Sequence, residues 1–273
     1  MVSPAILRFA LLLGAAPLVG AAALAQDDAA KPAASASAAD DDGSNPIDPE
    51  AMAAVDKMSA ALQALSSFHT QSDITTEVVL ATGQKIQFGG TMDTYARRPN
   101  AFKIVTKVDG KSRELYYDGK TFTIFAPTLG YYADFPAPGT IAATIDKASD
   151  EFGIEVPLAD LFTWGSDPAI RARVQEAMVI RPETIGDRTC MHYAFRQENA
   201  DWQVWIDQGA KALPCKIVIT NKTDPAMPQY SAVIDWASTA VPASENLAFS
   251  PPADAHRIAI TDVSEITSDG EGQ

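Results

Sequence analysis

Hydrophobic residues follow two different periods along the chain. From residue 48 to about residue 66 they recur every three or four positions, which predicts one amphipathic helix. Its apolar stripe consists of Met52, Val55, Met58, Leu62 and Leu65. Asp48 is suited to cap this helix, and Pro49 to occupy its first position. From Phe68 onwards the period falls to two, and most of the remaining chain is expected to form strands.

The expected strands fall into two groups with helices between them. The first group covers residues 71–80, 84–95, 101–108, 112–117 and 120–126. The second covers 178–183, 189–197, 202–207, 215–221 and 229–236, with a last short stretch at 256–263. Thr140 is suited to cap a helix, and a shorter helix is expected from Asp167-Pro168 to about residue 177. The pattern therefore predicts a mainly β protein of the α+β class.

The clearest hairpin turns at Asp118-Gly119, a pair that suits a type I′ turn. Pairing Tyr117 with Lys120 sets Leu115 opposite Phe122 and Arg113 opposite Ile124. One face of the hairpin then carries Leu115, Tyr117, Phe122 and Ile124, and the other carries Tyr116, Thr121, Thr123 and Phe125. Because both faces carry aromatic residues, we expect the sheet to be covered on both sides here.

Amphipathic helices are expected to cover this sheet. The helix that follows Thr140 has an apolar stripe of Ile141, Ile145, Ala148 and Phe152. In the second group of strands, Trp202, Val204 and Ile206 share one face. A helix laid over such faces encloses either an apolar ligand pocket or a filled core, and the residues alone leave both readings open.

The first 25 residues have the features of a secretory signal peptide. Ile6 to Leu13 form a short apolar segment with Arg8 just inside it. Ala23-Leu24-Ala25 matches a cleavage site, so the mature chain is expected to begin at Gln26. Gly14, Pro17 and Gly20 argue against an uncleaved membrane helix. Neither Cys190 nor Cys215 lies at the cleavage site, so a lipoprotein anchor is not expected. We expect a disordered spacer at 26–47, one domain at 48–263, and a flexible tail at 264–273.

Composition narrows the range of partners. The chain has 21 lysines and arginines against 35 aspartates and glutamates, which argues against nucleic acid and against docking on an anionic membrane.

An oxidising compartment would permit a disulfide between Cys190 and Cys215. If consecutive strands are neighbours, however, one strand separates these cysteines by roughly 9–10 Å, more than a disulfide spans. The bridge therefore requires a bent or frayed strand.

The sequence contains little that indicates catalysis. His69, His192 and His256 are far apart, and none has a partner at the spacing of a metal site. The segments at 110–112 and 119–121 mimic part of a phosphate loop, but Val105 and Glu114 stand where that loop needs glycine. We therefore expect no enzyme activity, no cofactor and no metal.

Several long segments resemble a known superfamily. Arg98-Pro99, the strand from Phe102 to Val108, Asp118-Gly119-Lys120 and the segment from Pro127 to Tyr132 resemble the bacterial lipoprotein carriers, the LolA/LolB-like proteins. Within that superfamily, "FGIEVPLADLF", "HYAFRQENADWQVWID" and "LPCKIVITNKTDPAMPQYSAVIDW" are similar to an uncharacterised family of predicted periplasmic proteins. The resemblance covers about residues 48–260.

This resemblance implies an open antiparallel half-barrel whose concave face is covered by helices. It implies a periplasmic protein that binds or carries a hydrophobic ligand, such as a lipid, an acyl chain or a lipoprotein. The alternative is an envelope regulatory or assembly protein that uses the same fold to bind a protein partner. The expected cavity wall is Leu115, Tyr117, Phe122, Ile124, Trp202 and Val204, and the expected lid is Ile141, Ile145 and Phe152.

Overall fold

The computed structural model describes residues 46–164, 171–238 and 240–261. The expected signal peptide and the tail at 264–273 lie outside these residues, as does the spacer apart from Pro46 and Ile47. The helix expected from Asp167 also begins outside them. The chain is already a strand at Glu176, so the predicted end of that helix at residue 177 is wrong.

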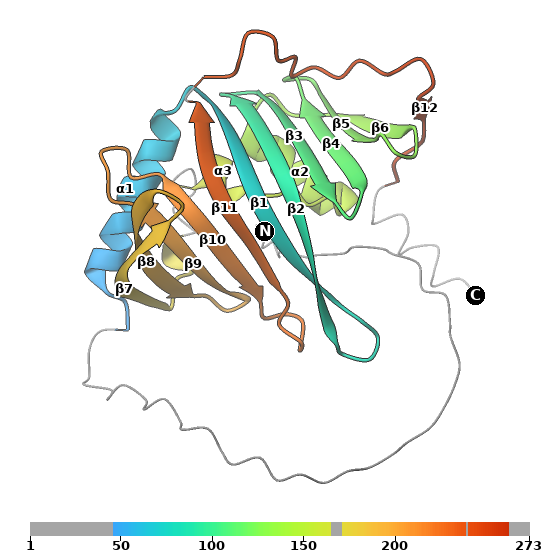
Figure 1. Cartoon of the computed structure of the whole chain (residues 1–273). Coiled ribbons are helices and arrows are strands. Elements are labelled where there is room, and N and C mark those ends of the chain that lie inside the picture. The colour runs from blue at the N-terminus through green and yellow to red at the C-terminus, as the bar shows by residue number, and fades with distance from the viewer. Residues whose placement is uncertain (1–45, 165–170, 239, 262–273) are drawn as a thin grey trace, which may run out of the picture.

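One 12-stranded sheet organises the molecule (Figure 1). In chain order its strands are β1 (Ser67–Val79), β2 (Lys85–Arg97), β3 (Ala101–Val108), β4 (Lys111–Tyr117), β5 (Thr121–Ala126), β6 (Tyr131–Pro136), β7 (Glu176–Ile185), β8 (Arg188–Arg196), β9 (Ala200–Asp207), β10 (Pro214–Asn221), β11 (Gln229–Ser238) and β12 (His256–Arg257). Their order across the sheet is β12-β6-β5-β4-β3-β2-β1-β11-β10-β9-β8-β7. The sheet is therefore open, with β12 and β7 at its edges, and the predicted fold class is confirmed.

The sheet consists of two meanders joined along one pairing. Strands β1 to β6 pair in chain order, and so do β7 to β11, all of them antiparallel. The antiparallel pairing of β1 with β11 joins the two meanders. β12 differs because it runs parallel to β6. The sequence missed β6, whose residues alternate apolar and polar over only six positions.

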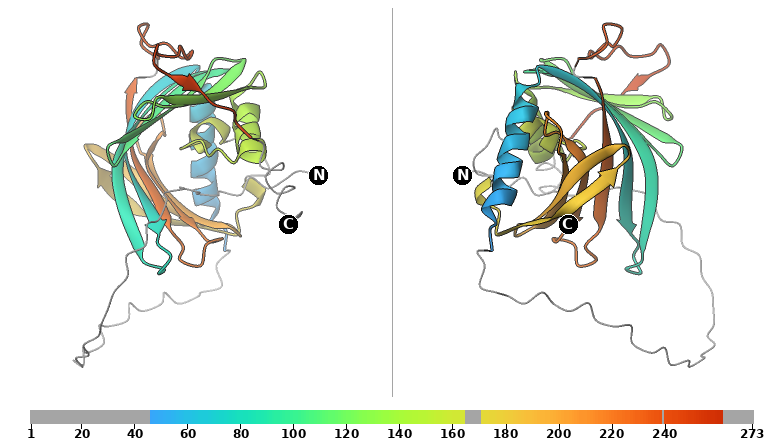
Figure 2. Two further views of the ribbon diagram at one scale, coloured as in Figure 1. Left: turned by 90° about the vertical axis from the view of Figure 1, so that its right-hand side faces the viewer. Right: turned by 60° about the vertical axis from the view of Figure 1, so that its left-hand side comes forward.

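Inside the curve of the sheet lie three helices whose bounds fall within the described residues (Figure 2). They are α1 (Pro49–Ala64), α2 (Ile141–Phe152) and α3 (Asp160–Thr163). As predicted, the Asp48 side chain caps α1 by accepting a hydrogen bond from the amide of Glu50 at 2.8 Å. Thr140 caps α2 through the amide of Ala143 at 3.3 Å. α2 ends at Gly153, whose φ of 62° is a left-handed conformation that glycine adopts without strain.

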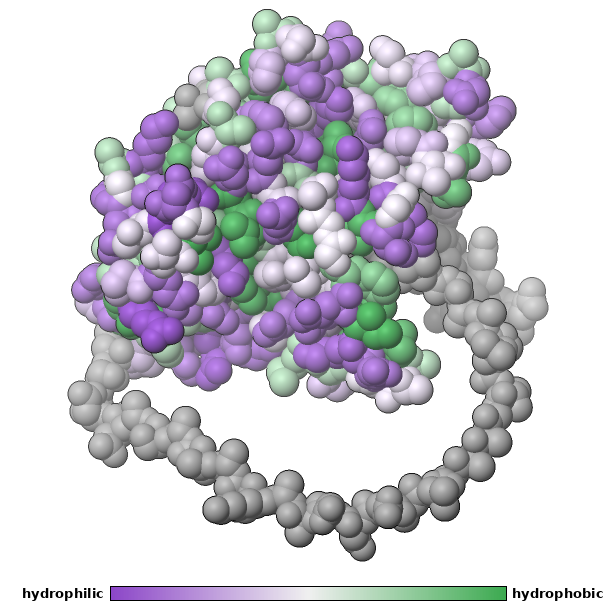
Figure 3. Space-filling model, in the orientation of Figure 1, coloured by the Kyte–Doolittle hydropathy of each residue, from purple (hydrophilic) through white to green (hydrophobic). Residues whose placement is uncertain are grey.

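The outer face of the sheet is mixed in character. In Figure 3, hydrophilic residues on this face alternate with scattered hydrophobic ones, as expected for an antiparallel sheet with one solvated side. The continuous hydrophobic core lies on the concave side, where the buried residues of α1, α2 and α3 meet those of the strands. The outer face is nevertheless covered at β4–β6, where residues 240–261 return over the sheet.

The Asp118-Gly119 hairpin has a different register from the expected one. Tyr117 pairs with Phe122 and Leu115 with Ile124, and three residues, 118–120, lie between the two strands rather than two. The Asp118 carboxylate accepts the amides of Lys120 and Thr121 at 3.0 and 2.9 Å, which favours this wider turn. Because the register differs by two positions, each side chain keeps its expected face.

A disulfide joins Cys190 on β8 to Cys215 on β10, with Cα atoms 6.6 Å apart. β9 lies between these two strands. The register of β10 against β9 shifts between Pro214 and Lys216, so Cys215 occupies a bulge. The bulge supplies the bend that this bridge requires. Both cysteines are fully buried and pack against Trp205 on the outer side of β9.

Candidate functional site on the concave face

The expected cavity-wall residues lie on two separate parts of the concave face. Leu115 and Tyr117 come from β4, and Phe122 and Ile124 from β5, whereas Trp202 and Val204 come from β9 near the other edge. Leu115, Tyr117, Phe122 and Val204 are at most 1% exposed, Trp202 is 9% exposed, and Ile124 is half-buried. All six belong to or pack against one hydrophobic core, with the helices between the two groups.

The expected lid residues pack on the part of the wall formed by β5 and β6. Ile141 and Ile145 are 3% and 8% exposed. The Phe152 ring stacks on the ring of Phe135 in β6 with centroids 4.4 Å apart, and Phe135 stacks in turn on Phe122 at 4.9 Å. α2 therefore covers this part of the sheet through a continuous stack of aromatic rings.

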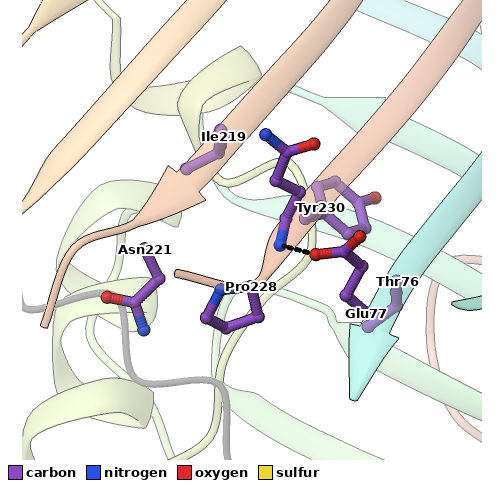
Figure 4. A pocket seen from close by; sticks show the side chains of 7 residues that line it. Thr76, Glu77, Ile219, Asn221, Pro228 and Tyr230 are labelled. Atoms are coloured by element: carbon purple, nitrogen blue, oxygen red, sulfur yellow. Dashed lines mark hydrogen bonds between the residues drawn. The ribbon is translucent and has the colours of Figure 1, made fainter. Parts of the chain in front are cut away.

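Two pockets found among the described residues are lined by other side chains. A small one, about 10 Å³, lies at the rim of the concave face beside Glu77, Pro228 and Tyr230 (Figure 4). The second, about 230 Å³, lies on the outer face near Tyr116 and Phe249. Neither contains a residue of the expected wall or lid. An open cavity between wall and lid therefore stays a prediction.

Arg98 connects the end of β2 to two of the covering helices. Its guanidinium donates hydrogen bonds to the carbonyl oxygens of Leu161 and Phe162 at 3.1 Å and of Leu62 at 3.5 Å. These carbonyls belong to α3 and to the end of α1, where a cation is favourable. Burial lowers the pKa of Arg98. In the sequence, Arg98 stands out only as part of the Arg98-Pro99 pair that resembles the lipoprotein carriers, so this role was missed.

Three buried hydroxyl groups interrupt the apolar wall. Thr70 and Ser72 lie on β1 and Thr94 on β2, with exposed fractions of 0%, 4% and 0%. Thr70 and Thr94 are directly paired across the two strands. Within the described part of the chain, none of the three hydroxyl oxygens has a hydrogen-bond partner. A buried polar group left in this state costs about 1–3 kcal/mol, so the wall contains unused hydrogen-bonding capacity.

Charged groups lie on the same side of the sheet as these hydroxyls. Burial raises the pKa of the Asp160 carboxyl at the start of α3. Burial also raises the pKa of Tyr230, with a further contribution from Asp160, whereas Arg113 lowers it. Burial lowers the pKa of Arg113 itself, although Glu155 opposes the change. The concave face therefore combines a large apolar wall with a few polar groups. The only sign of these polar groups in the sequence is their alternation with apolar neighbours.

Among the described residues, no group of three or more His, Cys, Asp or Glu side chains is placed to hold a metal ion. Within that same part of the chain, no helix is both apolar enough and long enough to cross a bilayer.

Solved structures with a similar fold come from several bacteria. The lipoprotein LppX of Mycobacterium tuberculosis shares 14% identity, covering 74% of this chain and 100% of that one, with a TM-score of 0.45. LprF of Mycobacterium bovis shares 13%, covering 77% and 99%, with a TM-score of 0.42. The MucA/MucB complex of Pseudomonas aeruginosa shares 14%, covering 77% of this chain and 64% of that one, with a TM-score of 0.41.

Comparison with curated proteins finds no match. A family model, in contrast, matches residues 51–261, which is nearly the whole of the described domain. The family predicted from the sequence segments is thereby confirmed. The chain belongs to the family described as "Predicted periplasmic protein (DUF2092)".

Proposed function

We propose that this protein is a non-enzymatic periplasmic carrier that binds an acyl chain or lipid between the concave face of the sheet and the helices that cover it. The hydrocarbon would lie along the apolar wall formed by β4, β5 and β9. The polar end of the ligand would occupy the centre of the wall, on β1 and β2. Apolar residues of β1, β2, β4, β5 and β9 all belong to one hydrophobic core, which supports placing both parts of the ligand on one face.

The unpartnered hydroxyls of Thr70, Ser72 and Thr94 are the observation that carries this proposal. A core selected only for stability would have apolar residues of similar shape at these positions, because an unused buried hydroxyl costs free energy. A carboxyl or ester group offers oxygen atoms that accept hydrogen bonds from such hydroxyls. Unused donors on an apolar wall therefore suit an acyl ligand better than a permanently filled core.

Ligand entry requires the covering helices to move away from the wall. α2 and α3 are attached to the sheet by ring stacking and by a few polar contacts, in which Arg98 and Tyr117 donate to backbone carbonyls. The Tyr117 hydroxyl donates to the carbonyl of Pro138, just before α2. Rotation of this segment about its ends would expose the wall without breaking a strand pairing.

Binding of a fluorescent fatty acid tests the proposal. Thr94→Val keeps the shape of the side chain and removes the hydroxyl, so it should weaken binding several-fold while leaving the fold unchanged or slightly more stable. Thr91→Val on the exposed face of the same strand is the matched control and should leave binding unchanged. Failure of the parent protein to bind the probe, or equal affinity in Thr94→Val, would reject the acyl-carrier function.

A second function is favoured by the edge strand β7. Met178 and Ile180 on this strand are 45% and 42% exposed, and β7 ends the order of strands in the sheet. At Ala177 the edge of β7 is already paired with the chain before α1, through a bridge to Ile47 and hydrogen bonds with Pro46 and Asp48. The exposed apolar side chains beyond this point suit a protein that packs an apolar segment there. Native mass spectrometry of protein from its own periplasm distinguishes the two functions. A bound lipid supports the carrier, whereas a bound protein that Ile180→Lys releases supports the partner-binding alternative.

A further inference from the structure

Residues 240–261, here called the strap, cross the outer face of β4, β5 and β6. Figure 1 shows this segment leaving the end of β11 and reaching β12 beside β6. Near its start, Glu245 pairs with Lys103 at 2.6 Å. At its other end, the amide of His256 donates to the carbonyl of Gly130 at 2.7 Å, and Arg257 pairs with Asp134. The strap is therefore fixed at both ends on the side opposite the helices.

The middle of the strap packs on aromatic residues of the sheet. Phe249 contacts three outward-facing rings, with centroid distances of 5.2 Å to Tyr116, 5.3 Å to Phe125 and 5.1 Å to Tyr132. Tyr116 and Phe125 belong to the second aromatic face of the Asp118-Gly119 hairpin, for which the sequence predicted a cover. Phe249 covers them only in part, because Tyr116 and Tyr132 also line a pocket next to it.

This strap pocket has a volume of about 230 Å³. Its lining consists of Tyr116, Asp118, Thr121, Thr123, Tyr132, Asp134, Phe249 and Pro251. The hollow exists because Thr123, a small side chain, stands between Tyr116 on β4 and Asp134 on β6 in the cross-strand register. The result is a pocket with aromatic walls, a small hydroxyl residue at its floor and carboxylates along its sides.

The two carboxylates of the pocket have different partners. Asp134 is held by the Arg257 guanidinium of the strap, with contacts of 2.9 and 2.5 Å. Asp118 accepts hydrogen bonds from two backbone amides and forms no ion pair within the described part of the chain. Two cations lie at the pocket, because Arg257 pairs with Asp134 and the Lys103 Nζ lies 5.5 Å from the centre of the Tyr116 ring. The Asp118 carboxylate pairs with neither of them, in a protein of net charge −14.

Aromatic rings together with an unbalanced carboxylate select a positively charged organic group. Ring faces attract ammonium groups, most strongly where water is excluded, and a carboxylate adds a direct charge interaction. An anion would be repelled by the Asp118 carboxylate, and an uncharged apolar group would shield this carboxylate from water without offering a charge in return. The volume suits a small molecule or a single head group rather than a chain.

We propose that the strap pocket is a binding site for the alkylammonium group of a small organic cation. The ammonium group lies against Tyr116, Tyr132 and Phe249, and the Asp118 carboxylate balances its charge. This site is on the opposite face of the sheet from the proposed acyl site, so the two can be occupied independently. An alkylammonium group can come from a free metabolite or from the head group of a zwitterionic lipid.

Titration of the full mature chain with choline, followed by NMR or calorimetry, tests this site. Its neutral isostere 3,3-dimethyl-1-butanol and glucose are the comparison ligands. We expect choline to bind and both comparison ligands to bind at least tenfold more weakly. Equal binding of the isostere, preferential binding of glucose, or no binding of choline at millimolar concentration would overturn the proposal.

Variants locate the binding within the molecule. Asp118→Asn should weaken choline binding about tenfold, the effect of one lost charge contact. Asp109→Asn is the matched control, because Asp109 precedes Gly110 in another exposed turn away from the pocket. Phe249→Ala should also weaken binding, with a thermal melt showing that the sheet remains folded. Unchanged affinity in Asp118→Asn would place the cation elsewhere and reject the site.

Vesicles of phosphatidylcholine distinguish the two sources of the group. Co-sedimentation that free choline and Asp118→Asn both abolish identifies a lipid head group as the ligand. Choline binding without co-sedimentation identifies a soluble ammonium compound. Either result supports the alkylammonium site, whereas co-sedimentation that Asp118→Asn leaves unchanged counts against it.

Discussion

Cys190 and Cys215 are bridged across β9, so the disulfide connects two strands that share no backbone hydrogen bonds. The bridge closes a loop between residues 25 apart in sequence. Converting both cysteines to serine should lower the free energy of unfolding by about 3 kcal/mol, chiefly because the unfolded chain gains freedom. Urea unfolding of the variant and of the oxidised parent measures this difference. Equal midpoints would show that the bridge does not stabilise the fold.

Phe122 tests whether the wall of β4 and β5 is permanently filled. The side chain is fully buried and stacks on Phe135. If it lies in a filled core, Phe122→Ala should cost about 3–5 kcal/mol. Thermal and urea unfolding give this value, with Lys111→Ala on the exposed end of β4 as the control. A much smaller cost, together with weaker uptake of a fluorescent fatty acid, would mean that the ring faces space used by a ligand.

Arg98 should determine how firmly the helices are attached to the sheet. Arg98→Met removes hydrogen bonds to Leu62, Leu161 and Phe162 while keeping much of the apolar stem. We expect a loss of about 2–4 kcal/mol, and faster hydrogen exchange in α3 than in β2. Arg97→Met is the matched control, because Arg97 is exposed and adjacent. Uniform acceleration of exchange over the whole sheet would contradict a local attachment.

Asp160 should make stability depend on pH. Because burial raises the pKa of its carboxyl in the folded protein, the folded state retains a proton that the unfolded chain has already released. Stability is therefore expected to fall as pH rises from the unfolded pKa, near 4, through the raised folded pKa. Asp160→Asn should remove this slope. Urea unfolding from pH 4 to 8 measures it, and identical slopes in both proteins would exclude Asp160 as the source.

Most of the fold could be predicted because residues that are neighbours in the sequence specify each of its helices and most of its strands. The cap at Asp48, the stripe of α2 and the alternation of β1 to β5 need only neighbouring residues to be recognised. The turn at Asp118 shows the limit of this reasoning. Its carboxylate stabilises a wider loop than the residue pair alone suggests, and the register depends on that contact.

Features that depend on distant residues could not be predicted. The bulge at Cys215 arises where β10 meets β9, and the strap pocket arises where Phe249 reaches strands more than 100 residues earlier. The hydroxyls of Thr70 and Thr94 look in sequence like ordinary strand residues. Their significance comes from burial under the helices, which no local pattern describes.

The pairing of β1 with β11 has a consequence for how the chain folds. Within each meander every strand pairs with its neighbour in sequence, so these contacts close short loops at little entropic cost. The β1–β11 pairing, for example Ile74 with Ala232, instead brings together residues from opposite ends of the domain. Two hairpin assemblies can therefore form early, and their docking along this seam becomes the slow step of folding. Until that docking is complete, both unpaired strands are open to association with other molecules, and this is the stage at which the nascent chain depends most on chaperones.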